Sequence, residues 1–453
     1  MRSINKGVFF IVLIAILGGI LVARSNFFRF NSTPQLIDRL PESDYLVRLK
    51  SLQFSKEINP ILFKYKLPIR EFASPEFMLG QAKHHGINIQ TAAYLFFNEA
   101  RDEWGALVQL NDSSKVINGI DRFRKNTAIT DSSTDEVRIF HFHELNIKIA
   151  YEKNYLFIYS GNLFSKRLTE VQHVKSGEVR PLWKRFLKRK KFRTENLVVY
   201  SESEGIKSWG FDYGLFAHDN DTTGLHIKCY LYTQVPHGII KKSKALGLPK
   251  TAQDSKAIEL HISRNIKDSK TGQKMIGKLH ELGKKISFPT RTFFDHWDGD
   301  LSFREGGVVN STQRIVTSEF DENFNVREVI KNERIQVPGY TAAFNTNANG
   351  KVFINSLFGK GLLRSEEQKL RFLFSPLLSM KHENSFYIFT SASHFPTLIA
   401  NPGNYIVWEY EGTPVNLRLS NIKRKSIELQ IDFPVKPLIN YLQRTKNRKK
   451  KAN

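Results

Sequence analysis

The sequence contains a single cysteine, Cys229, among 453 residues. One cysteine excludes an intrachain disulfide, so the cysteine content says nothing about the redox compartment. The chain also lacks the nucleophile elbow G-x-S-x-G, the zinc-binding helix H-E-x-x-H and any cysteine–histidine cluster. These absences exclude the common hydrolase and zinc-site signatures, and the sequence predicts no cofactor and no metal site.

Acidic residues are scarce relative to basic ones, because 44 Asp and Glu stand against 68 Lys and Arg, for a net charge of +24. Such a balance favours polyanionic neighbours, such as phospholipid headgroups, an anionic glycan or nucleic acid. Hydrophobic residues make up 41% of the chain and aromatic residues 12%, including 35 Phe. This composition is typical of a globular chain rich in β-structure and not of a disordered one.

The longest uncharged apolar run extends from Val8 to Ala23 and follows Arg2 and Lys6. At about 1.5 Å per residue it would span roughly 24 Å as a helix, slightly less than the ~30 Å hydrocarbon core of a bilayer. We expect an uncleaved signal anchor, with a cleaved signal peptide or a core helix as alternatives. The side chains expected to form the anchor are Val8, Phe9, Ile11, Leu13, Ile16, Leu17, Ile20 and Leu21.

The flanks of this run predict the orientation of the chain. Seven residues precede the apolar core, as in the n-region of an export signal, and long C-terminal domains are translocated largely regardless of their charge. The sequence therefore predicts a single-pass membrane protein whose bulk is extracytoplasmic, in a periplasm.

Basic residues are concentrated in two segments, between Trp183 and Arg193 and in the tail from residue 444 to 453. In the first, cations alternate with Trp183, Phe186 and Phe192, so the segment is either a solvated helix or a surface that binds an anionic partner. The cations expected to contact such a partner are Lys184, Arg185, Lys188, Arg189, Lys190, Lys191 and Arg193.

Two stretches of the chain are similar to one another. Residues 105–123 and 341–358 each have the order apolar strand, polar turn and amphipathic segment, with Asn111 matching Asn347. A second pair of matching blocks, at 154–161 and 384–391, follows in the same order and indicates duplication. We expect α+β architecture: an N-terminal transmembrane helix followed by two tandem, mainly antiparallel α+β repeats. The expected divisions are an anchor at 1–30, repeats at 31–240 and 257–443, a linker at 241–256 and a basic tail at 444–453.

Local patterns predict individual elements within these divisions. Alternating or β-branched runs predict strands at Tyr45–Leu49, Leu156–Tyr159 and Tyr405–Tyr410, among others. Helical periodicity is clearest at Ser114–Arg124 and Lys351–Leu357.

Several of these segments together resemble a family of exported, membrane- or lipid-anchored bacterial envelope proteins defined by a domain of unknown function. The segments are Leu36–Ile58, His84–Phe97, the strand, turn and helix that begin at Gly105, and Asp295–Phe303. The resemblance implies a repeated α+β envelope protein without an assigned activity. The chain departs from the lipidated members because Arg24, and not Cys, follows the apolar run.

Two clusters have a composition suited to chemistry. Asp295, His296, Asp298 and Asp300 lie within six residues, a density that acid–base catalysis or a cation would use, although Asp298-Gly299 is also a hairpin turn signal. In the sequence HFHE, His141 and His143 would share one face of a strand and could bind a metal, but a third ligand is lacking.

Three functions remain open on this evidence. The first is a membrane-anchored, extracytoplasmic envelope protein that binds or scaffolds without catalysis. Its expected partners are the membrane and an anionic lipid, a glycan or another envelope protein. The alternatives are an anchored metal-dependent hydrolase that uses the clusters above and a cytoplasm-facing nucleic-acid-binding protein that uses the basic run, although nucleic acid is not the expected partner.

Overall fold

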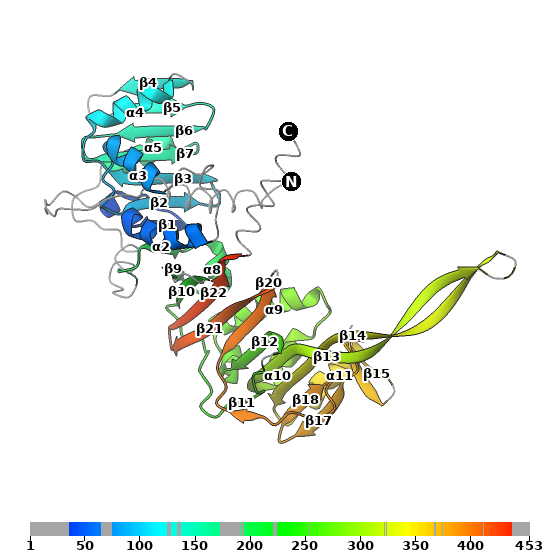
Figure 1. Cartoon of the computed structure of the whole chain (residues 1–453). Helices are drawn as coiled ribbons and strands as arrows, with labels where there is room; N and C mark the ends of the chain where they lie inside the picture. The colour runs from blue at the N-terminus through cyan, green and yellow to red at the C-terminus, as the bar shows by residue number, and fades with distance from the viewer. Residues whose placement is uncertain are drawn as a thin grey trace. The chain divides into compact units, whose positions relative to one another are not determined.

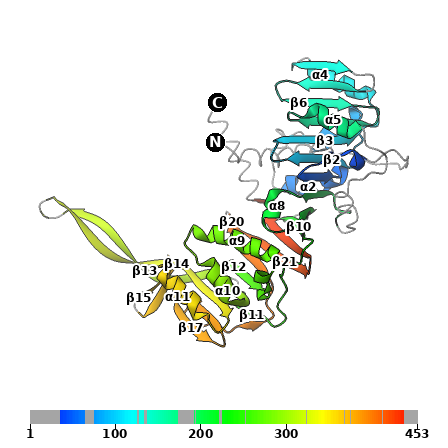
Figure 2. The same ribbon diagram turned by 180° about the vertical axis from the view of Figure 1, so that it is seen from behind.

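A computed structural model of the chain describes residues 36–64, 75–124, 128–133, 137–172, 192, 194–220, 224–251, 253–320, 322, 324–366, 368–373, 375–410 and 412–436. By their internal contacts the residues divide into two compact units. Among the described residues, unit 1 comprises those within 36–207, 212–231 and 432–436, and unit 2 comprises those within 208–211 and 232–431. The two units are coloured by residue number in Figure 1 and are seen from behind in Figure 2.

The elements up to residue 232 are, in chain order, η1 (Leu36–Arg39), β1 (Tyr45–Leu49), α2 (Ser51–Lys64), α3 (Pro75–His84), β2 (Ala93–Asn98), β3 (Glu103–Gln109), α4 (Ser114–Arg124), β4 (Ile129–Ser133), β5 (Arg138–Phe142), β6 (Ile147–Tyr151), β7 (Tyr155–Ser160), α5 (Phe164–Gln172), β8 (Leu197–Ser201), α8 (Glu204–Ser208), β9 (Tyr213–Asn220) and β10 (Gly224–Tyr232).

The later elements are β11 (Leu246–Gly247), β12 (Asp254–His261), η2 (Arg264–Asp268), α9 (Lys270–Lys284), α10 (Thr290–His296), β13 (Trp297–Phe320), β14 (Val326–Thr346), α11 (Lys351–Gly359), β15 (Leu363–Glu366), β16 (Lys369–Phe372), β17 (Ser379–Glu383), β18 (Phe386–Thr390), β19 (Ile399–Ala400), β20 (Tyr405–Tyr410), β21 (Thr413–Lys423) and β22 (Ser426–Pro434).

Unit 1 is built on one antiparallel sheet with the order β4-β5-β6-β7-β3-β2-β1-β8-β9. Because successive side chains of a strand point to opposite faces, β7 presents Leu156 to one face and Phe157 to the other. The Leu156 face packs against α2, α3 and α4 through a cluster that includes Leu79 and Val116. On the other face, Phe157 stacks on Phe164 of α5 at 6.0 Å between ring centroids, and the two views agree with this division of the helices (Figures 1 and 2).

The α5 face of unit 1 contains a buried ion pair. Glu103 of β3 and Arg167 of α5 pair there, with side chains exposed by 1% and 2%. Glu103 also accepts hydrogen bonds from Tyr159 Oη at 2.6 Å and Asn98 Nδ2 at 2.5 Å. Burial raises the pKa of the Glu103 carboxyl, but the hydrogen bonds from Arg167, Tyr159 and Asn98 outweigh it and lower the pKa overall. The carboxylate is therefore charged and fully partnered in the fold.

Within unit 2, antiparallel strands pair in the order β21-β20-β12-β13-β14-β18-β17. Two short pairs, β11 with β19 and β15 with β16, lie beside these strands. Helices α9, α10 and α11 pack on one face, where Phe293 of α10 stacks on Trp297 at 5.6 Å and meets Phe353 of α11 at 5.2 Å. The outer halves of β13 and β14 extend beyond the sheet as a long twisted hairpin (Figure 1).

The opposite face of this sheet holds a buried charged network. Asp300, Ser302 and Arg304 of β13 are at most 5% exposed, as are Glu259 and His261 of β12. Arg304 pairs with Glu259, and Ser302 donates a hydrogen bond to the same carboxylate. Lys242 Nζ closes the other end of the network at 2.7 Å from Asp300 Oδ2. Each buried charge thus has a partner of opposite sign, as burial requires.

His261 lies between two carboxylates in this network. Its Nδ1 is 2.8 Å from Asp300 Oδ1 and its Nε2 is 2.8 Å from Glu259 Oε1. A carboxylate only accepts hydrogen bonds, so both ring nitrogens donate and the ring is an imidazolium. Burial lowers the pKa of His261, but the hydrogen bonds and negative charges of Asp300 and Glu259 outweigh it, so the pKa is raised.

The predicted fold class is wrong. The structure is mainly antiparallel sheet and not a transmembrane helix followed by two tandem α+β repeats. The units are not tandem, because residues 212–231 of unit 1 lie between two segments of unit 2. Residues 241–256, expected to be a linker, lie within unit 2, where Lys242 contacts Asp300 and residues 246–247 form β11.

The predicted localisation as a single-pass membrane protein is also corrected. Within the part of the chain that the structure describes, no helix is both long and apolar enough to cross a bilayer. The physical reason is length and polarity: α9 has 15 residues and includes Lys, His and Glu, whereas a span needs about 20 mainly apolar residues. The predicted anchor residues, Val8 to Leu21, lie outside the described residues.

The buried pair of unit 1 gives a first prediction. Replacing Arg167 by Met leaves the Glu103 carboxylate buried without its cation, which should cost unit 1 about 3–5 kcal/mol of stability. The double replacement Glu103→Met with Arg167→Met removes both charges and should cost much less. Hydrogen exchange of β3 and β7 measures the difference; equal losses in the single and double variants would contradict this account.

His261 gives a second prediction, in which stability depends on pH. A pKa raised above the unfolded value of about 6.5 stabilises the fold fully below that pH. This contribution is lost as the pH rises from about 6.5 through the folded pKa. In urea unfolding followed by circular dichroism, His261→Gln should be less stable and should lose this part of the pH dependence. An unchanged alkaline slope in the variant would show that another group is responsible.

Candidate ligand-binding site

The helix-covered face of the unit 2 sheet contains an apolar cavity of about 510 Å³. Its floor is formed by two rungs of the sheet, because Leu301 pairs with Phe344 and Phe303 pairs with Ala342. Ala342 also pairs with Phe389 of β18, so the smallest side chain of the floor lies between two phenylalanines. The missing bulk at Ala342 is one physical reason that the cavity exists.

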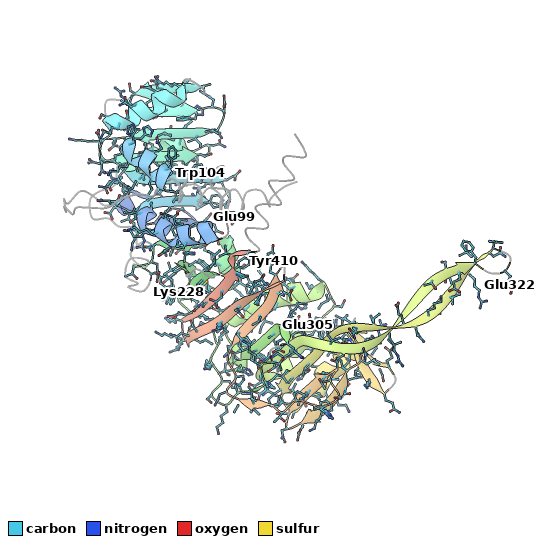
Figure 3. All side chains as sticks on the ribbon, in the orientation of Figure 1. Glu99, Trp104, Lys228, Glu305, Glu322 and Tyr410 are labelled. Atoms are coloured by element: carbon cyan, nitrogen blue, oxygen red, sulfur yellow. The ribbon has the colours of Figure 1, made fainter. Side chains whose placement is uncertain are left out.

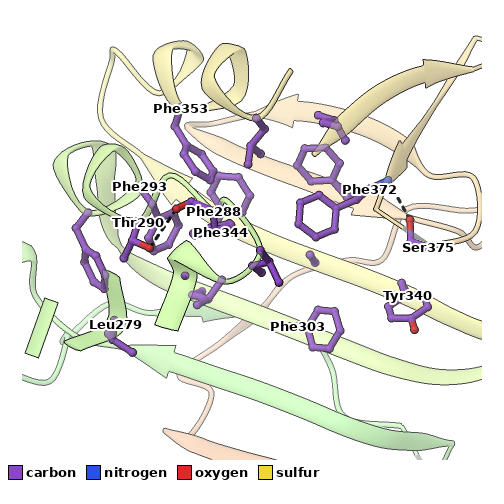
Figure 4. A pocket seen from close by; sticks show the side chains of 18 of the residues that line it. Leu279, Phe288, Thr290, Phe293, Phe303, Tyr340, Phe344, Phe353, Phe372 and Ser375 are labelled. Carbon is purple, nitrogen blue, oxygen red and sulfur yellow. Dashed lines mark hydrogen bonds between the residues drawn. The ribbon is translucent and has the colours of Figure 1, made fainter. Parts of the chain in front are cut away.

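The walls of the cavity come from the helices and the β15–β16 pair. Phe353 of α11 lies 5.6 Å from Phe344 and 5.9 Å from Phe288, measured between ring centroids. The aromatic side chains gather around the hollow in Figure 4. The lining residues are Leu279, Leu282, Gly283, Ile286, Phe288, Thr290, Phe293, Phe294, Leu301, Phe303, Tyr340, Ala342, Phe344, Phe353, Leu357, Leu363, Phe372, Ser375, Leu378 and Phe389.

The few polar groups of the wall already have partners within the protein. Thr290 Oγ1 donates to the Phe288 carbonyl at 3.4 Å, and Ser375 Oγ donates to the Pro376 carbonyl at 2.9 Å and accepts from the Phe372 amide at 3.1 Å. Two of these bonds are drawn in Figure 4. Tyr340 has a raised pKa because it is partly buried and lies beside Glu305, itself paired with Lys256 at 2.7 Å. The wall therefore selects for apolar surface.

The opening of the cavity combines apolar and basic side chains of α9 and the residues after it. Leu282 is 53% exposed and Ile286 is 51% exposed, which is high for large hydrophobic residues. Lys278 and Lys285 are exposed and lie four residues before and three residues after Leu282. Lys278 lies one helical turn before Leu282 on the same face of α9, and Lys285 is the C-cap residue of α9, so both cations lie near these apolar residues along the chain.

The structure brings only part of the predicted acidic cluster together, because Asp298 and Asp300 both lie against Lys242 Nζ, at 3.9 Å and 2.7 Å, and His296 contacts another residue. His296 Nδ1 lies 3.2 Å from Asn347 Oδ1, and Asp298 is half-exposed at 3.9 Å from Lys242. Asp300 is buried against His261, whereas the Asp295 carbonyl accepts a hydrogen bond from Asn347 Nδ2 at 3.2 Å. Asp298-Gly299 forms a bulge at the start of β13 and not a hairpin turn, since Gly299 has φ +98° and packs on the Ile262 carbonyl.

The structure places the two histidines of HFHE, His141 and His143, next to each other. The rings of His141 and His143 lie 4.0 Å apart between centroids, and His143 Nε2 is 3.0 Å from Thr130 Oγ1. Burial, followed by the nearby charges of His143 and Lys148, lowers the pKa of His141. Over the described residues, no group of three or more His, Cys, Asp or Glu is placed to hold a metal ion.

The remaining predicted site residues cannot be compared with the structure. The cations Lys184, Arg185, Lys188, Arg189, Lys190, Lys191 and Arg193 and the tail at 444–453 lie outside the described residues. The cavity was not predicted from the sequence. Its only available signal was the density of Phe between residues 288 and 303, because the other lining residues are scattered over about a hundred positions.

Comparisons with known proteins do not assign the chain to a family. No protein-family model and no curated protein matches the chain. Solved structures of TP0453 in its crystal forms III, IV and I are similar to it, with 10%, 10% and 11% sequence identity. They cover 44%, 44% and 45% of this chain and 80%, 79% and 81% of their own, with TM-scores of 0.32, 0.31 and 0.31. Similarity at this level assigns neither fold nor function, and the predicted resemblance to an envelope-protein family stays a prediction.

Proposed function

We propose that unit 2 is a binding module without catalysis, and that its ligand is an anionic amphiphile whose hydrocarbon chain enters the apolar cavity. The observation that carries the proposal is that the apolar side chains at the start of β13 are less buried than the polar side chains next to them. Leu301 and Phe303 are only half-buried, whereas their polar neighbours Ser302 and Arg304 are buried. Apolar side chains left partly uncovered inside a fold gain about 25 cal/mol per Å² when a ligand covers them.

The chemistry of the wall limits the class of ligand. A volume of about 510 Å³ lies in the range of ligand pockets, which hold roughly 300–1,000 Å³. Since the hydroxyls of Thr290 and Ser375 are already bonded within the protein, a polar ligand would lose its hydrogen bonds to water without replacement. A flexible hydrocarbon chain has no such cost, which favours it over a sugar or a nucleotide.

The basic residues near the opening are the reason for proposing that the ligand is anionic. Lys278 lies on the same face of α9 as exposed Leu282, and exposed Lys285 is the C-cap residue of this helix. A carboxylate or phosphate at the end of the chain would be held there in solvent, by modest and salt-dependent attraction. This arrangement agrees with the excess of basic residues in the whole chain, a net charge of +24.

Filling the floor of the cavity tests the proposal. Ala342→Leu places a larger side chain between Phe303 and Phe389, so binding of the fluorescent fatty acid cis-parinaric acid should weaken about tenfold or more. Ala400→Leu is the matched control, because Ala400 is exposed on β19 and does not line the cavity. Fluorescence titration measures binding, and thermal unfolding verifies that both variants are folded.

Two results would overturn the proposal. One is a wild-type chain that does not take up the probe at all. The other is a folded Ala342→Leu variant that binds the probe as tightly as the wild type does, since the chain would then occupy another site.

The charges at the opening give a separate prediction. Lys278→Glu combined with Lys285→Glu should weaken competition by palmitate about two- to thirtyfold at low salt, from two surface charge interactions of about 0.2–1 kcal/mol each. Competition by hexadecanol, which has the same chain and no charge, should stay unchanged. Equal effects on the two competitors would show that the lysines do not select the anionic headgroup.

A further inference from the structure

The outer part of the β13–β14 hairpin, hereafter the arm, comprises residues 308–320 and 326–338. Its strands pair from Val308 with Pro338 to Phe320 with Val326. Among the described residues, pairing with β12 ends at Gly306 and pairing with β18 ends at Thr341, so the arm is a two-stranded ribbon. It extends away from the rest of unit 2 in both views (Figures 1 and 2). An isolated two-stranded ribbon is at best marginally stable in water, and its open edges and faces favour a partner.

The outer part of one face of the arm carries exposed apolar side chains. Residues directly opposite each other in a ladder share a face, and so do residues two apart along a strand. The rung of Val316 and Ile330 is therefore on the same face as the rung of Phe320 and Val326. Their exposures are 59% and 52%, and 72% and 67%. Phe324, in the turn, is 86% exposed, so apolar side chains continue to the tip.

Side chains on the other face of the arm interact with one another and with the backbone of the arm. Lys331 pairs there with Glu319, and Thr317 donates a hydrogen bond to the Val329 carbonyl at 3.3 Å. Val329 and Val337 on this face are half-buried. The face with the Phe320 and Val326 rung is thus the one that needs a cover, and it is called the docking face.

Charge along the arm indicates what covers it. From Val316 to Glu328 the sequence has four acidic residues and one basic residue, in a chain whose net charge is +24. Glu322 lies at the tip, as Figure 3 shows, and exposed Arg334 lies on the docking face nearer the base. An acidic tip is repelled by an anionic bilayer and by nucleic acid. It attracts the basic end of the same face in a second copy.

We propose that two copies of this chain associate through their docking faces, with the arms antiparallel. A two-fold axis at the rung of Ser318 and Glu328 places the Val316–Ile330 rung of each copy over the Phe320–Val326 rung of the other. The same operation places Arg334 over the acidic tip of the other copy. The contact is isologous and closes as a dimer, without further growth.

The first test measures the mass of the full-length chain by sedimentation velocity over a wide dilution series. The wild type should form a dimer that dissociates on dilution. Val326→Thr with Ile330→Thr should raise the dissociation constant about tenfold or more, while the β-branched replacements keep the strand propensity of the arm. Val329→Thr with Val337→Thr is the matched control, because it makes the same kind of change on the opposite face, and it should leave the dimer intact.

A charge exchange tests whether the partner is a second copy. Arg334→Glu and Glu322→Arg should each weaken self-association, since each brings like charges together. An equimolar mixture of the two variants should form a mixed dimer, in which both contacts join opposite charges. Glu328→Gln should tighten the wild-type dimer, because the two Glu328 side chains meet at the proposed axis.

Several outcomes would overturn the inference. A wild type that stays monomeric at the highest concentration excludes the dimer. A dimer that tolerates the docking-face substitutions, or that weakens equally in the matched control, has another interface. Cosedimentation of a monomeric wild type with phosphatidylcholine vesicles, lost in the docking-face variant, would assign the arm to a lipid surface instead.

Discussion

The strict two-residue alternation of β13 is the constraint on which unit 2 depends. One set of its side chains, Asp300, Ser302 and Arg304, is buried in the charged network, and the intervening set, Leu301 and Phe303, faces the cavity. A slip of one residue between β12 and β13 would exchange these sets, leaving buried carboxylates without partners and apolar side chains among charges. The ion pairs therefore fix the register of the sheet, and the register in turn fixes the floor of the cavity.

The sequence predicted local elements better than it predicted their assembly. The strand at Tyr45–Leu49 and the helix at Ser114–Arg124 agree with the structure residue for residue, because the first is a short run rich in apolar residues and the second has apolar side chains at helical spacing. The class failed because it extended similarity between short blocks to whole consecutive units, whereas the chain leaves unit 1, enters unit 2 and returns. Contacts between residues 206 positions apart, such as His226 with Asp432, have no local signal.

The candidate site could not be predicted for the same physical reason, since it is formed by contacts between residues that are distant in the sequence. Asp295, His296, Asp298 and Asp300 attracted attention because they are adjacent, but the strand directs Asp300 into the charged network while His296 contacts Asn347. The cavity has no reactive residues to find. It results from a small side chain, Ala342, paired between Phe303 and Phe389, and pairing of this kind is known only once the register is known.

The cavity and the arm are formed by the same two strands but are physically independent. After Gly306 the register of β13 shifts, and beyond it Val308, Val316 and Phe320 are exposed. Close packing marks this point, because a Cβ on Gly306 would lie 2.2 Å from the Gln253 carbonyl and one on Gly339 would lie 2.8 Å from the Gly306 carbonyl. Because Gly306 and Gly339 lack a side chain, the base of the arm can pack closely against the rest of unit 2. Since the floor residues lie before this point in β13 and after Gly339 in β14, a substitution on the outer arm leaves the rungs of the cavity in place, and a substitution in the cavity leaves the docking face unchanged.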